Sequence, residues 1–185
     1  FEASDGTVTD WTYAAFDGLT AQVAATFVSA GAGPDAPVHL ALTNSPAFVA
    51  AWIAAVRLGT CIVPSDPMAT TAELADHIER TRPAIGLCAA ERSGVYLAAC
   101  GPDLHVIRLD EDDSDLADLS AHPADELAAI TEPMGRAAVM FTSGTTGRPK
   151  GVVLTQANYA FAGTTMAAAA GLGPDDRQLV VLPMF

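Results

Sequence analysis

The residues best suited to chemistry lie in one short stretch of the sequence, residues 141–151. Three glycines, four hydroxyl side chains and two cations fall within these eleven residues. Glycines let backbone N–H groups converge on an anion without obstruction by a Cβ atom, and hydroxyls donate further hydrogen bonds. Arg148 and Lys150 add positive charge, which is scarce in the rest of this acidic chain. The stretch is therefore predicted to be a phosphate-binding loop.

The order of residues in this loop differs from that of a Walker A motif. A Walker A lysine is followed by serine or threonine, whereas Gly151 follows Lys150 here. The next residues, 152–154, are apolar and strand-like, so no helix N-terminus is expected to point at the phosphates. We expect the stretch to link two strands as an exposed, mobile loop that binds phosphate through its own backbone and side chains.

The composition of the chain disfavours several other functions. A net charge of −13 and a pI near 4.3 would repel nucleic acids and anionic lipid surfaces. No apolar run approaches the roughly 20 residues needed to span a membrane. The three cysteines lack a CxxC spacing, which predicts reduced thiols, and the four histidines occur singly, which predicts no metal site. We expect a cytoplasmic protein that binds no nucleic acid and has no membrane span.

The segments around the loop alternate between helical and strand-like patterns. Helices are expected at residues 12–30, 45–59, 70–82, 95–100 and 155–170. Thr12, Thr70 and Thr155 are expected caps, and Asn44-Ser45-Pro46 is a cap and first-turn signal for the second helix. Strands are expected at residues 38–43, 60–64, 84–89, 104–109, 137–142 and 152–154. Residues 110–118 are mostly acidic and are predicted to form a solvated loop. The alternation predicts an α/β fold, with a layered, mostly parallel sheet flanked by helices.

Both ends of the chain resemble segments from the interior of a longer sequence. The first residue is Phe1 rather than methionine, and residues 178–185 form a strand-like apolar run with no polar tail. No linker divides the chain. We therefore expect residues 1–185 to be part of one larger domain.

The loop also carries a resemblance to a known family. The run Thr142-Ser143-Gly144-Thr145-Thr146-Gly147-Arg148-Pro149-Lys150-Gly151 resembles the phosphate-loop signature of the AMP-binding, adenylate-forming superfamily. This superfamily includes acyl-CoA synthetases, adenylation domains of nonribosomal peptide synthetases, and luciferases. Trp11-Thr12-Tyr13 is similar to the family's early Thr-Tyr motif. Arg57-Leu58-Gly59, Val63-Pro64 and Asp66-Pro67 resemble its helix, Gly and Val-Pro motif, so the resemblance extends along the chain.

The resemblance implies both a fold and a reaction. The chain would be part of the large N-terminal domain of an enzyme that uses ATP and Mg²⁺ to convert a small-molecule carboxylic acid to an acyl-AMP. Coenzyme A would be the second substrate and would receive the acyl group as a thioester. The family's other functional elements would lie beyond Phe185, so these 185 residues alone are expected to be inactive.

The resemblance also implies roles for individual loop residues. The residues expected to bind the nucleotide are Thr142, Ser143, Gly144, Thr145, Thr146, Gly147, Arg148, Lys150 and Gly151. By the same analogy Thr142 would contact Mg²⁺. Lys150 would be the catalytic residue, because its charge would stabilise the pyrophosphate as it leaves.

Two alternative functions remain open at this point. One is an amino-acid adenylation domain that loads a carrier protein, and the other is a non-catalytic nucleotide-binding protein. Phe141, Thr145 and the run Leu182-Pro183-Met184-Phe185 favour the CoA ligase branch. The loop of an amino-acid adenylation domain usually begins with tyrosine and has serine at the position of Thr145. We therefore expect an acid–CoA ligase.

Overall fold

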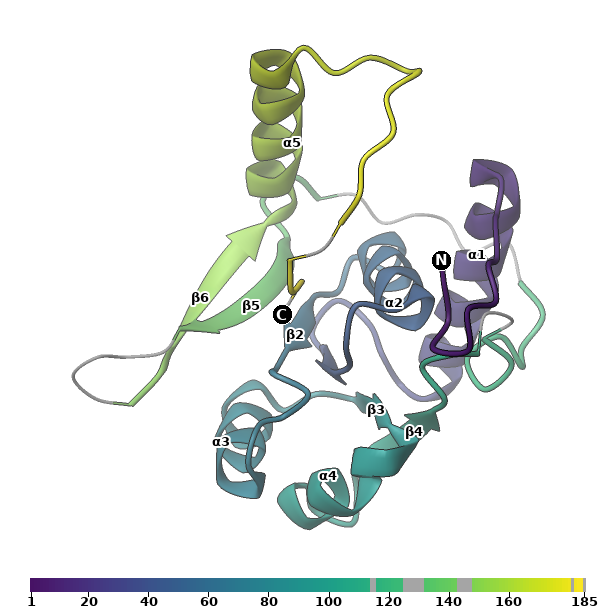
Figure 1. The fold of residues 1–185 in the computed structure, drawn as a ribbon. Coiled ribbons are helices and arrows are strands. Elements are labelled where there is room, and N and C mark those ends of the chain that lie inside the picture. Colours follow the sequence, from purple (N-terminus) through teal and green to yellow (C-terminus); the bar gives the residue numbers. More distant parts are fainter. Residues whose placement is uncertain (114–115, 125–131, 143–147, 181, 185) are drawn as a thin grey trace.

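A computed structural model describes residues 1–113, 116–124, 132–142, 148–180 and 182–184 of the chain (Figure 1). The helices are α1 (Tyr13–Ser29), α2 (Pro46–Arg57), α3 (Thr71–Thr81), α4 (Ser93–Ala99) and α5 (Gln156–Ala170), with a 3-10 turn at Ala90–Arg92. The strands are β1 (Val38–Ala41), β2 (Ile62–Pro64), β3 (Ile85–Ala89), β4 (His105–Leu109), β5 (Arg136–Thr142) and β6 (Lys150–Thr155). Helices and strands alternate from α1 to β4, as the sequence predicts.

All six strands belong to one sheet, in the order β4-β3-β1-β2-β5-β6. Every neighbouring pair is parallel except β5 and β6, which pair antiparallel. The α1 and α2 helices pack together on one face of the sheet, and α3 and α4 pack together on the other (Figure 1). The prediction of a mostly parallel, layered α/β fold is therefore confirmed.

Side chains on β1 alternate between the two faces and show where the core lies. Val38 and Leu40 are fully buried in the main cluster with α1 and α2. Ala41 belongs to a second cluster under α3 and α4, and His39, also fully buried, lies on that same face because strand side chains alternate. The main core is therefore apolar, while the α3 side of the sheet contains a polar side chain.

Helices α1, α2, α3 and α5 begin where the sequence predicts a cap, whereas α4 has no side-chain cap. The Thr12, Ser45, Thr70 and Thr155 hydroxyls each accept a hydrogen bond from a backbone N–H in the first turn of the helix that follows. At α3 the Glu73 carboxylate also accepts from the Thr70 N–H at 2.8 Å, which completes a capping box. These bonds satisfy N–H groups that the helix itself leaves without partners.

Two segments differ from the predictions. The strand prediction for residues 178–185 is wrong for the described residues 178–180 and 182–184, which have no strand conformation. A strand requires a paired neighbour. Among the described residues of this segment, the backbone is bound by the Asn44 side chain, through the Leu182 carbonyl at 2.7 Å and the Met184 N–H at 3.0 Å, and the Met184 side chain packs against the main core. The acidic segment is also more than a solvated loop, because its Leu116 is buried in the main core.

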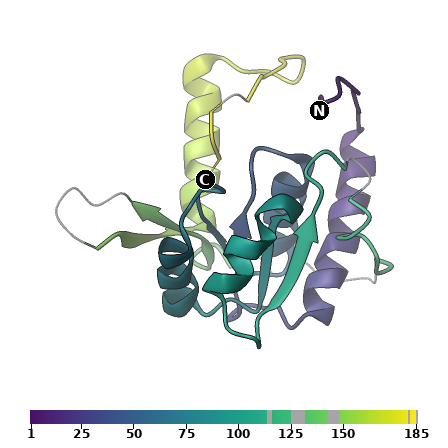
Figure 2. The same ribbon diagram turned by 60° about the horizontal axis from the view of Figure 1, so that its bottom comes forward.

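Helix α5 and the β5–β6 hairpin stand out from the rest of the molecule in both views (Figures 1 and 2). The α5 helix buries no side chain, and its Tyr159 contacts Trp52 of α2 with the ring centroids 5.1 Å apart. None of the described helices is long and apolar enough to cross a membrane.

Candidate functional site

The candidate site is a crevice at the carboxyl ends of β2 and β5. The chain leaves β2 toward β3, across β1, whereas it leaves β5 in the other direction, toward β6. Neighbouring parallel strands whose connections diverge leave an opening beyond their carboxyl ends, where α/β proteins commonly bind ligands. A cavity of about 490 Å³ lies here, lined by Pro64, Ser65, Asp66, Met68, Ala69, Glu73, His77, Phe141, Thr142, Pro149 and Pro183.

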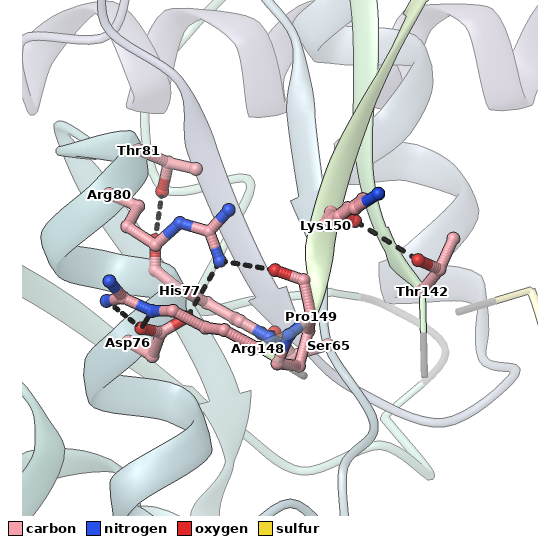
Figure 3. Close-up of polar contacts among 9 residues, drawn as sticks. All are labelled: Ser65, Asp76, His77, Arg80, Thr81, Thr142, Arg148, Pro149 and Lys150. Atoms are coloured by element: carbon pink, nitrogen blue, oxygen red, sulfur yellow. Dashed lines mark hydrogen bonds and ion pairs between the residues drawn. The ribbon is translucent and has the colours of Figure 1, made fainter. Parts of the chain in front are cut away.

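The stems of the predicted phosphate loop meet beside this cavity. Thr142 is the last residue of β5 and Lys150 is the first of β6, and the two are paired across the hairpin, as are Phe141 and Gly151. The Thr142 hydroxyl lies 3.4 Å from the Lys150 carbonyl oxygen, a long contact that leaves it free to bind a ligand (Figure 3). The structure confirms that the loop links two strands.

Five of the predicted binding residues, Ser143, Gly144, Thr145, Thr146 and Gly147, lie outside the described residues. Lys150 is exposed, and its amino group points away from α3 (Figure 3). Within the described part of the chain Lys150 forms no ion pair. Its charge is therefore available to an anion at the mouth of the hairpin.

Arg148 lies differently from Lys150, because its guanidinium is paired with Asp76 of α3. The Nε atom donates to Asp76 Oδ1 at 2.6 Å, and a second contact joins Nη2 to the same oxygen. Hydrogen bonds from Arg148, and then from Arg80, hold the pKa of the Asp76 carboxyl below its usual value. An anion that bound Arg148 would have to compete with Asp76.

Helix α3 makes two further contacts with the stems of the loop. Arg80 Nη1 donates to the Pro149 carbonyl oxygen at 2.8 Å and to Asp76 Oδ2 at 2.9 Å (Figure 3). The His77 ring stacks on Phe141 with the centroids 3.8 Å apart and the planes within 10°. The Arg80 Cζ atom lies 4.7 Å from the centroid of the same Phe141 ring. One face of α3 therefore contacts both stems.

A buried chain of polar groups continues from His77 into the core. Ser65 Oγ lies 2.7 Å from His77 Nδ1 and 3.0 Å from His39 Nε2. On its other side, His39 Nδ1 lies 2.7 Å from the Tyr96 hydroxyl oxygen. Burial lowers the pKa of His39 to about 3, helped by the nearby His77, and burial also lowers the pKa of His77. Both rings are therefore neutral at pH 7.

The direction of the hydrogen bonds in this chain follows from burial. Tyr96 is buried, so its hydroxyl hydrogen needs an acceptor, and His39 Nδ1 is the acceptor beside it. His39 then carries its proton on Nε2 and donates to Ser65 Oγ, which in turn donates to His77 Nδ1. In this assignment His77 carries its own proton on Nε2.

The histidines occur singly in the sequence, yet the structure brings His39 and His77 together on Ser65. The register between β1 and β2 brings these residues together, and their spacing in the sequence does not indicate it. Leu40 pairs with Pro64, and the Leu40 carbonyl accepts a hydrogen bond from the Ser65 N–H at 2.8 Å. That register places Ser65 beside His39, which a single sequence does not reveal.

Comparison with known proteins gives a consistent result along the whole chain. The family model for AMP-binding enzymes matches residues 2–185. The crotonobetaine/carnitine–CoA ligase of Citrobacter koseri is 30% identical over 197 residues, covering 100% of this chain and 38% of that enzyme. Nonribosomal peptide synthetase 1 of Aspergillus fumigatus is 32% identical over 170 residues, covering 91% of this chain and 3% of that protein.

Solved structures extend the comparison to three dimensions. The apo structure of MatB from Rhodopseudomonas palustris superposes with a TM-score of 0.86 and 27% identity, over 99% of this chain and 36% of MatB. The ATP-bound structure of the same protein superposes with a TM-score of 0.82 and 26% identity, over 95% of this chain and 35% of MatB. The chain thus spans little more than a third of the length of the CoA ligase and MatB.

Proposed function

Since this chain belongs to the family of AMP-binding enzymes, we propose that the whole protein uses ATP to activate a carboxylic acid as an acyl-AMP and then forms a thioester with coenzyme A. Residues 1–185 would form part of its large N-terminal domain. The observation that carries the proposal is the pairing of Thr142 with Lys150 at the mouth of the hairpin, in a chain that matches the family from residue 2 to residue 185.

The described donors suit a triphosphate. Lys150 is exposed and unpaired within the described residues, and the Thr142 hydroxyl makes only a long contact. The nearby carboxylates of Glu73 and Asp66 are engaged by the backbone N–H groups of Thr70 and Met68, both at 2.8 Å. These hydrogen bonds direct the two carboxylates toward the backbone but leave their negative charge in place, so the positive charge of Lys150 would be needed to attract a triphosphate.

Catalysis of this reaction requires alignment and charge stabilisation more than covalent chemistry by the protein. A carboxylate is already ionised at pH 7, so its attack on the α-phosphorus of ATP needs no general base. Pyrophosphate leaves with growing negative charge, which Lys150 would stabilise. The oxygen of Thr142 is a suitable ligand for Mg²⁺, an ion that would add further positive charge beside the phosphates.

The proposal is tested with the full-length protein by acid-dependent exchange of radioactive pyrophosphate into ATP. We expect one or a few acids from a panel of acyl, aryl and dicarboxylic acids to support exchange in the presence of Mg²⁺. The same acids should then give a thioester when coenzyme A is added. A folded full-length protein that binds ATP but supports no exchange with these acids or with amino acids would leave only the non-catalytic alternative.

The second candidate function is an amino-acid adenylation domain, favoured by the 32% identity to nonribosomal peptide synthetase 1. The acceptor of the acyl group separates the two candidates. A CoA ligase releases free acyl-CoA, whereas an adenylation domain transfers the aminoacyl group to the phosphopantetheine of a carrier protein. Exchange that depends on amino acids alone, with no thioester formed on coenzyme A, would favour the second candidate.

A further inference from the structure

We propose that α3 is the positioning element of the phosphate loop, with His77 and Arg80 holding the segments that enter and leave it. The inference rests on the proposed function for its catalytic consequence, although the contacts themselves do not depend on it. These residues need not touch substrate. They would act by fixing the backbone from which Thr142 and Lys150 project.

The segment that enters the loop is held through Phe141. One side of the Phe141 ring is covered by His77, stacked at 3.8 Å, and the Arg80 guanidinium lies 4.7 Å from the ring centroid. On the hairpin side, a Cβ atom placed on Gly151 would lie 3.4 Å from Phe141 Cε1. Phe141 is therefore restrained between α3 and β6, and Thr142 follows it directly.

The segment that leaves the loop is held through its backbone. Arg80 donates to the carbonyl oxygen of Pro149, and Asp76 pairs with Arg148 (Figure 3). Proline already fixes one backbone dihedral at this point, so the bond to its carbonyl restrains the peptide that joins Pro149 to Lys150. The direction in which the Lys150 side chain leaves the backbone is thereby restrained by α3 as well as by its pairing with Thr142.

The α3 helix is itself tied to the sheet by groups deep in the fold. His77 is joined to Ser65, and through Ser65 to His39, which is fully buried. Leu74 of α3 is buried against the same side of the sheet. The loop stems are therefore held in place by the rigid sheet, through α3, and not by a solvent-exposed helix alone.

The alternative explanation is that these contacts only stabilise the fold. The Arg148 side chain is 65% exposed, however, and exposed ion pairs contribute little to the free energy of unfolding. Arg80 is also part-exposed, at 30%. Their removal should change the positions of Thr142 and Lys150 much more than the melting temperature, and these two effects can be measured separately.

The test compares Arg80→Ala and Arg80→Lys with a matched control, Arg57→Ala, in the full-length protein. Arg57 forms an ion pair with Asp17 that joins α2 to α1, on the other face of the sheet. Two readouts are taken for each variant: amide hydrogen exchange in peptides that contain Phe141 and Lys150, and the rates of the two half-reactions. Acyl-AMP formation is followed by pyrophosphate exchange, and thioester formation is started from synthetic acyl-AMP and coenzyme A.

We expect Arg80→Ala to speed hydrogen exchange in these peptides and to slow acyl-AMP formation about tenfold or more, as misalignment of reacting groups does. Thioester formation and the melting temperature should stay near the wild-type values. Arg80→Lys should recover part of the rate, because it keeps the charge beside Asp76 but loses the planar group over Phe141. His77→Phe, which keeps the stacking on Phe141 and loses the bond to Ser65, should give an intermediate effect.

The outcomes separate this inference from the proposed function. Faster hydrogen exchange in Arg80→Ala, together with a wild-type protein that shows no acid-dependent pyrophosphate exchange, supports the positioning role and rejects the proposed reaction. Unchanged hydrogen exchange overturns the positioning role, whatever the activity of the wild type. Equal loss in both half-reactions, with a lower melting temperature, also overturns it and shows that Arg80 only stabilises the fold.

Discussion

The hydroxyl of Tyr96 occupies the space in which a side chain on Gly86 would begin. A Cβ atom placed on Gly86 of β3 would lie 2.2 Å from the Tyr96 hydroxyl oxygen and 2.8 Å from two of its ring carbons. The same hydroxyl lies 2.7 Å from His39 Nδ1 on the neighbouring strand. Because Gly86 has no side chain, Tyr96 can lie against the sheet and reach His39.

We predict that Gly86→Ala lowers the free energy of unfolding by about 1–3 kcal/mol, the usual cost of forcing extra atoms into a packed core. Tyr96→Phe alone should cost about 0.5–1.5 kcal/mol, because it removes the hydrogen bond to His39. The double variant should lose less than the sum of the two, since the closest contact of the new Cβ atom is then gone. Urea unfolding of the four proteins measures this coupling, and simple additivity would contradict the clash.

A second prediction concerns the dependence of stability on pH. The native pKa of His39 is about 3, well below the usual value near 6.5, so below pH 6.5 the unfolded chain binds a proton that the native protein excludes. The stabilisation is therefore complete above about pH 6.5 and is lost progressively as the pH falls toward 3. Between pH 6.5 and 5 the loss should approach about 2 kcal/mol.

The matched variant for this experiment is His39→Gln, whose side chain stays neutral throughout. Its free energy of unfolding should vary less between pH 6.5 and 5 than that of the wild type, with a remaining slope in the same direction from His77. Denaturant unfolding at several pH values measures the two slopes. Parallel curves for the wild type and His39→Gln would show that His39 is not the group responsible.

A third prediction concerns Lys150 in the full-length protein. Replacing it with alanine should slow acyl-AMP formation by roughly tenfold to a thousandfold, as for other lost electrostatic donors. Arginine at this position should recover only part of the rate. Thioester formation from synthetic acyl-AMP should be near normal, because pyrophosphate has already gone. Equal loss in both half-reactions would point to a structural role for Lys150.

A fourth prediction concerns the capping box at the start of α3. Thr70→Ala removes the hydroxyl that accepts from the Glu73 N–H and should cost about 0.5–2 kcal/mol of stability. The matched control is Thr71→Ala, one residue later within the helix, which should change stability by only a few tenths of a kcal/mol. Similar losses in both variants, measured by thermal unfolding, would contradict a specific capping role.

Much of the fold follows from local features of the sequence. Thr12, Thr70 and Thr155 mark helix starts because a hydroxyl before an amphipathic or alanine-rich run can satisfy free N–H groups. The alternation of these helices with apolar strands is enough to predict a parallel sheet. Residues 178–185 show the limit of this reasoning, since strand-like composition forms a strand only where a partner strand is available.

Only some of the residues at the candidate site lie close together in the sequence. The sequence predicts Thr142 and Lys150 as binding residues, because glycines, hydroxyls and cations are close together in the chain, and the hairpin brings the two residues opposite each other. The partners of the loop on α3 could not be predicted. Asp76 and Arg148 lie far apart in sequence, and an ion pair between them depends on how α3 packs beside the β5–β6 hairpin.

The pairing of β2 with β5 has a consequence for the order in which the protein folds. The units from β1 to β4 connect strands through short helical segments, whereas β5 joins the sheet through the pairing of Ala138 with Ile62, much earlier in the chain. Contacts between residues distant in sequence form late, because the intervening chain must first lose its freedom. We therefore expect the hairpin to be the last described part of the sheet to dock during folding. A nucleotide that binds at its mouth would recognise only chains whose sheet is already complete, and would slow their unfolding.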